Sequence, residues 1–150
     1  MKSLNSQGYK LITGFEGFSS TPYLCSAKVP TIGYGSTYYT NGKSVTMKDK
    51  PITRAVGFWM FQKIADDFAK HVNKLLTSEV NQEQFNSLVS ICYNIGKTNF
   101  SKSTLLKLVN INPKDQNIYK EFLKWNKANK KVVDGLTKRR EIEAKLYFNK

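Results

Sequence analysis

The sequence predicts an α+β protein with two lobes, in which a small N-terminal β-sheet lobe is joined by a long helix to a helical C-terminal lobe. Three features indicate this architecture. Residues 22–46 are rich in Pro, Gly, Tyr, Thr and Val, which is typical of short strands and turns. Apolar residues then recur at helical spacing over residues 53–76, and shorter helical patterns follow to the end of the chain.

The 150 residues are predicted to form one domain, because 40% apolar and 13% aromatic residues can supply a core at this length. Within it, the N-terminal lobe would cover about residues 14–52 and the C-terminal lobe about residues 77–150. The connecting helix would lie between them, over about residues 53–76. Proteins built from two lobes commonly bind their ligands in the crevice between them.

A helix over residues 4–16 is expected to open the chain, and it could pack on the C-terminal lobe. Its apolar residues share one stripe near the helical period: Leu4, Leu11, Ile12 and Phe15. Gly17 follows the expected end, so Glu16 would stand at the helix C-terminus. The negative end of the helix dipole and the adjoining phenylalanines both favour the uncharged form of that carboxyl group.

The sheet and the long helix come next in the chain. Residues 22–46 predict two or three short antiparallel strands, and Asn41-Gly42 between strand-forming residues predicts a hairpin turn. Pro51 and Thr53 are typical start signals for the helix over residues 53–76.

The first helix of the C-terminal lobe is expected over residues 81–96. Asn81 and Gln84 have the spacing of a capping box, and Gly96 is a typical stop signal. Cys92 lies on the apolar face, where we expect it to pack in the core.

The rest of this lobe is predicted to hold three helices around one basic loop, residues 127–135. Arg139 and Glu143 stand four residues apart and could form a weak surface pair. The expected helices cover residues 103–110, a segment that begins with Asn112 as cap and Pro113 in the first turn, and residues 136–148.

The charge balance predicts a polyanionic partner. The chain has 24 Lys and Arg against 11 Asp and Glu, a net charge of +13, which favours a nucleic acid, an anionic membrane or an acidic wall polymer. No apolar run is long enough for a signal peptide or a membrane span, so we expect synthesis in the cytoplasm and no stable membrane insertion. Two cysteines do not make a disulfide framework.

Glu16 is the candidate general acid, because an uncharged carboxyl group can protonate a leaving oxygen, as in glycoside hydrolysis. That reaction usually uses a second carboxylate, but the next acidic residue is Asp49. Cys25 could fill the second position as a thiolate, and Thr31 could orient a water molecule. The single histidine and two cysteines do not match known zinc-site spacings.

The chain resembles phage-type lysozymes, the endolysins of glycoside hydrolase family 24. Members of that family carry Glu, eight residues, Asp or Cys, five residues and Thr, which correspond here to Glu16, Cys25 and Thr31, and Thr31 opens the family's TIGYG turn. The landmarks NQEQFNSLVSICYNIG, STLL, FLKWN and GLTKRREIE follow in the family's order. Two departures stand out: Asp is commonest where Cys25 stands, and the position after GYG is often His but is Ser36 here.

The resemblance implies hydrolysis of the β-1,4 bond between N-acetylmuramic acid and N-acetylglucosamine in peptidoglycan, with no metal and no cofactor. It implies that Glu16 is the general acid, that Cys25 holds the second catalytic place and that Thr31 positions water or sugar. The positions of its substrate contacts correspond to Thr37, Tyr93 and Thr104. We expect a monomer that acts on the wall after a separate protein permeabilises the membrane. The charge leaves two alternatives: a cationic membrane-disrupting protein and a nucleic-acid binder.

Overall fold

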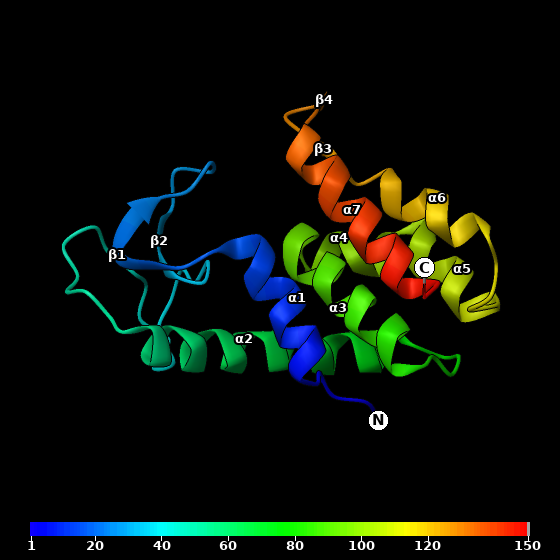
Figure 1. Ribbon diagram of the computed structural model, residues 1–150, viewed down its shortest axis with the longest axis horizontal. Coiled ribbons are helices and arrows are strands. Elements are labelled where there is room, and N and C mark those ends of the chain that lie inside the picture. The colour runs from blue at the N-terminus through cyan, green and yellow to red at the C-terminus, as the bar shows by residue number, and fades with distance from the viewer. Residues whose placement is uncertain (150) are drawn as a thin grey trace. The chain divides into compact units, whose positions relative to one another are not determined.

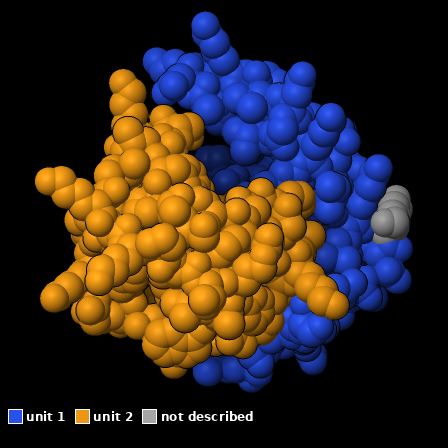
Figure 2. Space-filling view, turned by 60° about the vertical axis from the view of Figure 1, so that its left-hand side comes forward, with its two compact units in different colours: residues 1–8, 68–150 blue, residues 9–67 orange. Residues whose placement is uncertain are grey.

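The computed structural model describes residues 1–149, and the chain divides into two compact units, which Figure 2 shows in different colours. Unit 2 comprises residues 9–67, and unit 1 comprises residues 1–8 and 68–150. The divisions fall within two helices, α1 (Ser6–Glu16) and α2 (Arg54–Leu75). The predicted α+β class is confirmed, with a small sheet near the N-terminus, a long helix, and a C-terminal half that is largely helical but holds a second two-stranded sheet.

The sheet of unit 2 consists of two antiparallel strands, β1 (Ser19–Leu24) and β2 (Pro30–Gly33), with Tyr23 paired to Thr31. The chain then turns at Asn41-Gly42, where Gly42 has a φ of +87° and an antiparallel bridge joins Tyr38 to Ser44. The predicted hairpin signal is therefore confirmed. The small core of this unit is formed by Ile32, Val45 and Met60, with Tyr39 and Ile52 packed against it.

The start of α2 packs closely against the sheet because glycines meet there. A Cβ added to Gly57 would lie 2.8 Å from the ring of Phe18, and one added to Gly33 would lie 3.4 Å from the Cα of Gly57. Larger residues would push the helix away from β2. This contact fixes the face of α2 that the sheet covers.

Unit 1 is built mainly from five helices, of which α3 lies against α7 (Figure 1). The capping box of Asn81 and Gln84 and the stop at Gly96 form as predicted, and Cys92 is fully buried. The elements are α3 (Gln82–Ile95), α4 (Lys97–Lys102), α5 (Thr104–Ile111), α6 (Asn117–Leu123), β3 (Lys127–Ala128), β4 (Lys131–Val132) and α7 (Asp134–Tyr147).

The helix predicted to begin at Asn112 and Pro113 begins instead at Asn117, so that prediction was wrong. Asn112 is the C-cap of α5, and its side chain accepts a hydrogen bond from the Lys114 N–H at 3.0 Å. Asp115 then accepts one from the Asn117 N–H at 2.9 Å. These side chains stabilise a turn where the sequence pattern had indicated a first helical turn.

The basic loop predicted over residues 127–135 is a β-hairpin, and α7 begins earlier than expected, at Asp134. Its turn residues Asn129 and Lys130 have positive φ values of 51° and 66°. Two successive residues with positive φ form a type I′ turn, whose twist matches that of the paired strands. Lysine seldom adopts a positive φ.

The predicted weak surface pair of Arg139 and Glu143 is part of a buried network instead. The side chains of Arg140 and Glu143 are fully buried, and that of Arg139 is 7% exposed. Arg140 Nε lies 2.6 Å from Glu143 Oε1, Arg139 Nε lies 3.5 Å from Glu143 Oε2, and Ser90 on α3 donates a hydrogen bond to Glu143. The network ties α7 to α3.

Candidate active site

Glu16 is the last residue of α1, where the sequence placed it. The Gly17 N–H donates to the Thr13 carbonyl at 3.0 Å, and Gly17 takes a φ of +67°, so the chain turns directly after the carboxyl-bearing residue. Gly35 lies against that carboxyl group: a Cβ added to it would lie 2.7 Å from Glu16 Oε1. Gly35 also has a φ of +85°, so the position disfavours any other residue on two counts.

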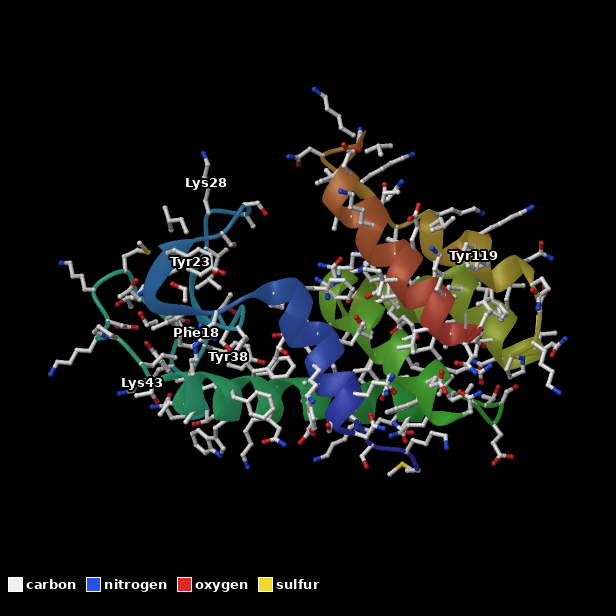
Figure 3. The ribbon with its side chains drawn as sticks, viewed as in Figure 1. Phe18, Tyr23, Lys28, Tyr38, Lys43 and Tyr119 are labelled. Atoms are coloured by element: carbon white, nitrogen blue, oxygen red, sulfur yellow. The ribbon has the colours of Figure 1, made fainter. Side chains whose placement is uncertain are left out.

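Cys25 directly follows β1 and begins the turn into β2. Its N–H donates to the Val29 carbonyl at 3.1 Å, and its carbonyl accepts from the Lys28 N–H at 2.8 Å. The turn requires a φ of 61° at Lys28, which Figure 3 labels near its tip. The side chain of Cys25 is therefore held by a short, well-bonded loop and remains accessible.

Thr31 on β2 stands beside the thiol and is almost fully buried. The pKa of Cys25 is lowered from its ordinary value, most strongly by a backbone hydrogen bond with Val29 and next by the Thr31 side chain. The Thr31 hydroxyl also donates to the Val29 carbonyl at 2.8 Å. Because a hydroxyl has one proton, it can donate to only one of these two acceptors at a time.

Tyr23 is a member of this cluster that the sequence interpretation missed. It lies on β1 (Figure 3), where it pairs with Thr31, and its pKa is raised by burial and by the charges of Glu16 and Cys25. A signal for it was present, since Tyr23 stands only two residues before Cys25 in the chain. Glu16, Tyr23, Cys25 and Thr31 are thus brought together within unit 2.

The three predicted contact residues are distributed over both units. Thr37 belongs to unit 2, where its carbonyl accepts from the Val45 N–H at 2.9 Å. Tyr93 lies on α3 in unit 1, with its ring 5.2 Å from that of Phe68. Thr104 is the first residue of α5, is exposed, and follows the N-cap Ser103.

Within residues 1–149, no group of three or more His, Cys, Asp or Glu side chains is arranged to hold a metal ion. The same residues include no helix with the length and apolar character needed to cross a bilayer. The chemical groups that the cluster does offer are one carboxyl group, one thiol, one phenol and one hydroxyl. Such a set can transfer a proton and orient water.

We expect Cys25 to react with iodoacetamide at a lower pH than a free thiol, whose pKa is about 8.5. The lowered pKa makes the thiolate available nearer neutrality. Buried Cys92, with its pKa raised to about 12, should stay unmodified in the folded protein. Mass spectrometry of the alkylated protein across a pH series would measure both rates.

The Thr31 variants provide the control for this prediction. Thr31→Val should move the midpoint of Cys25 alkylation to higher pH, whereas Thr31→Ser, which keeps the hydroxyl, should not. A Cys25 midpoint at or above that of free cysteine would show that the loop does not stabilise the thiolate.

Comparison with known proteins places the fold in the lysozyme class. The chain belongs to the phage lysozyme family, whose model matches residues 13–143. The resemblance recognised in the sequence is therefore confirmed.

Individual relatives agree with the family assignment. The endolysin of Bacillus phage B103 is 36% identical over 146 residues, which are 97% of this chain but 54% of that protein. The endolysin of Salmonella phage P22 is 31% identical over 149 residues, covering 99% of this chain and 100% of the relative. This chain thus spans about half the length of the Bacillus phage relative and the full length of the Salmonella phage one.

A solved structure confirms the fold. The endolysin from Escherichia coli O157:H7 phage FAHEc1 superposes with a TM-score of 0.90 at 33% sequence identity. The match covers 99% of this chain and 94% of that endolysin.

Proposed function

We propose that this chain is a peptidoglycan hydrolase, an N-acetylmuramidase that cleaves the β-1,4 bond between N-acetylmuramic acid and N-acetylglucosamine and so lyses bacterial cells. One observation carries the proposal: in a member of the phage lysozyme family, a carboxyl group at a helix end is held against Gly35, and its charge and that of Cys25 both act on Tyr23, the strand partner of Thr31. Among the functions that the charge alone allowed, the family favours this one over membrane disruption and nucleic-acid binding.

In this proposal Glu16 donates its proton to the glycosidic oxygen as the bond breaks. The sugar then develops positive charge, which most glycosidases stabilise with a second carboxylate. Here a Cys25 thiolate would supply the negative charge, and the lowered pKa of that thiol supports this role. Thr31 would orient water or sugar next to the thiol, and Thr37, Tyr93 and Thr104 would contact the glycan.

The charge of the chain supports the choice of substrate. Peptidoglycan and its attached polymers are anionic, and a protein with a net charge of +13 is attracted to them over roughly a Debye length, about 8 Å at physiological salt. We propose that the chain acts on the cell wall as a monomer, after the membrane has been permeabilised, and that it needs no nucleic acid.

The experiment that tests this function is digestion of purified sacculi, followed by borohydride reduction and mass spectrometry of the fragments. A muramidase produces fragments whose reduced end is muramic acid. Reduced glucosamine ends would identify a glucosaminidase instead, and new amino groups without reducing sugar would identify an amidase or peptidase. Heat-denatured protein at the same concentration controls for spontaneous lysis.

A further inference from the structure

A groove of about 400 Å³ lies on unit 2, and none of the candidate active-site residues lines it. Its volume is within the range of about 300–1,000 Å³ that is usual for small-ligand sites. One wall is the turn after the sheet and the other is the first half of α2, with lining residues that include Tyr38, Tyr39, Thr40, Trp59, Lys63 and Asp67.

The groove uses a different face of α2 from the one that packs on the sheet. Trp59, Lys63 and Asp67 are spaced four apart, so they share one face of the helix. Gly57 and Phe61 share another, which contacts Gly33 and Tyr34. The groove is therefore separate from the sheet-side surface of the helix.

Two aromatic side chains remain exposed in this groove although apolar cores lie close by. Trp59 is 50% exposed and Tyr38 is 42% exposed. Figure 3 labels Tyr38 beside the first turns of α2. Lys63 lies over Trp59, with its Nζ 5.9 Å from the ring centroid. A half-exposed ring flanked by a cation, a carboxylate and a hydroxyl suits a ligand that has both apolar faces and polar edges.

A pyranose ring has this character, because its axial C–H groups form apolar faces and its hydroxyl and acetamido groups form a polar edge. Trp59 and Tyr38 offer aromatic rings to the faces, while Thr40 and Asp67 add a hydroxyl and a carboxylate to the lining for the edge. The ammonium group of Lys63 complements the lactyl carboxylate that distinguishes muramic acid from glucosamine. Lys63 and Asp67 together leave the lining without net charge, so its exposed aromatic rings carry the choice of an aminosugar.

We propose that this groove is a second, non-catalytic binding site for the aminosugar backbone of peptidoglycan. The proposal rests on the proposed function, since it takes the same polymer as the substrate. An insoluble polymer offers many equivalent sites, so a second weak contact raises the local concentration of the enzyme on the wall without changing the chemical step.

The groove can be tested with a soluble probe, β-1,4-linked N-acetylglucosamine tetrasaccharide. The chain has two tryptophans, Trp59 and Trp125, whose indole N–H groups give separate NMR signals. In a Glu16→Gln background, which prevents turnover, the Trp59 signal should shift saturably with the tetrasaccharide. Tyr38→Phe, which keeps the stacking ring, should preserve the shift, and Tyr38→Ala should weaken it. A Trp59 signal that moves only with anionic phospholipid vesicles would overturn the proposal.

Co-sedimentation with sacculi gives an independent measurement in the same background. Trp59→Ala should weaken binding about threefold to tenfold, as expected when one of two linked contacts is lost. Ile111→Ala, which removes an apolar side chain that is 79% exposed elsewhere, should bind like its parent. Unchanged binding of Trp59→Ala would refute the site. Binding that disappears when phosphate polymers are stripped from the sacculi would assign it to those polymers instead.

The two proposals fail in different ways. If the wild-type protein releases no reducing muramic acid, the proposed function fails, while the Trp59 signal still reports whether the groove takes an aminosugar. If digestion proceeds and the Trp59 signal does not respond, only the second site is lost.

Discussion

Glu16→Gln should lower the rate of sacculus digestion by about a thousandfold, within the range of 10² to 10⁴ typical of general acid catalysis. The amide has nearly the same shape as the carboxyl group but has no proton to give to the leaving oxygen. Release of reducing sugar from purified sacculi measures the rate. Glu79→Gln is the matched control, because it changes the net charge equally at an exposed position. Digestion by Glu16→Gln at the control rate would remove Glu16 from the mechanism.

Gly35→Ala tests whether the position of that carboxyl group matters as well as its proton. An added Cβ would lie 2.7 Å from Glu16 Oε1, and a φ of +85° is itself unfavourable for alanine. Displacement of the acid by about an ångström can cost roughly a hundredfold in rate. The double variant that combines Glu16→Gln with Gly35→Ala should digest sacculi no more slowly than Glu16→Gln alone, because displacing a side chain that has no proton to donate costs no further rate.

The elements that the sequence predicted well are those determined by neighbouring residues. The capping box of Asn81 and Gln84 and the stop at Gly96 lie within one helix, so local chemistry alone defines α3. The spacing of Glu16, Cys25 and Thr31 could be recognised because α1 and a single strand pair place all three in unit 2. Short sequence separation is the reason that a local pattern could group residues that lie in one unit.

The errors arose where a side chain or a tertiary contact decided the structure. Asn112 and Asp115 have the composition of a helix start, yet their side chains stabilise a turn. Lys130 adopts a positive φ that its residue type does not indicate. Gly35 looked like an ordinary turn glycine, and its contact with Glu16 becomes visible only when α1 and the sheet are placed together.

Burial was the property that the sequence could least predict. Arg139 and Glu143 are four apart on a strongly charged helix, which is the usual pattern of a solvated surface pair. The face of α7 that carries them packs instead against α3, where Ser90 donates a hydrogen bond to Glu143. Which face of a charged helix is covered depends on its partner helix, and that information is not local.

Arg140→Met should therefore destabilise the protein by about 3–5 kcal/mol, the range observed when one partner of a buried ion pair is removed. Arg140 and Glu143 are both 0% exposed, so the variant leaves a carboxylate in a dry site with Arg139 as its remaining cation. Lys124→Met is the matched control. Its pair with Glu121 has the same spacing and the same 2.6 Å distance, but Lys124 is 68% exposed, so the loss should be about 0–1 kcal/mol. Urea unfolding followed by circular dichroism measures both.

The pH dependence distinguishes an unpaired charge from simple loss of packing. Burial raises the pKa of Glu143, and Arg140 is the main group that opposes this shift. Without Arg140 the folded variant should bind a proton more tightly than the unfolded chain does. The stability of the variant should then be greatest below the pKa that Glu143 has in the unfolded chain. It should fall as the pH rises through the pKa that Glu143 has in the folded variant. The deficit relative to wild type should be smaller at pH 5 than at pH 8, whereas a cavity left by the smaller side chain would cost the same at both.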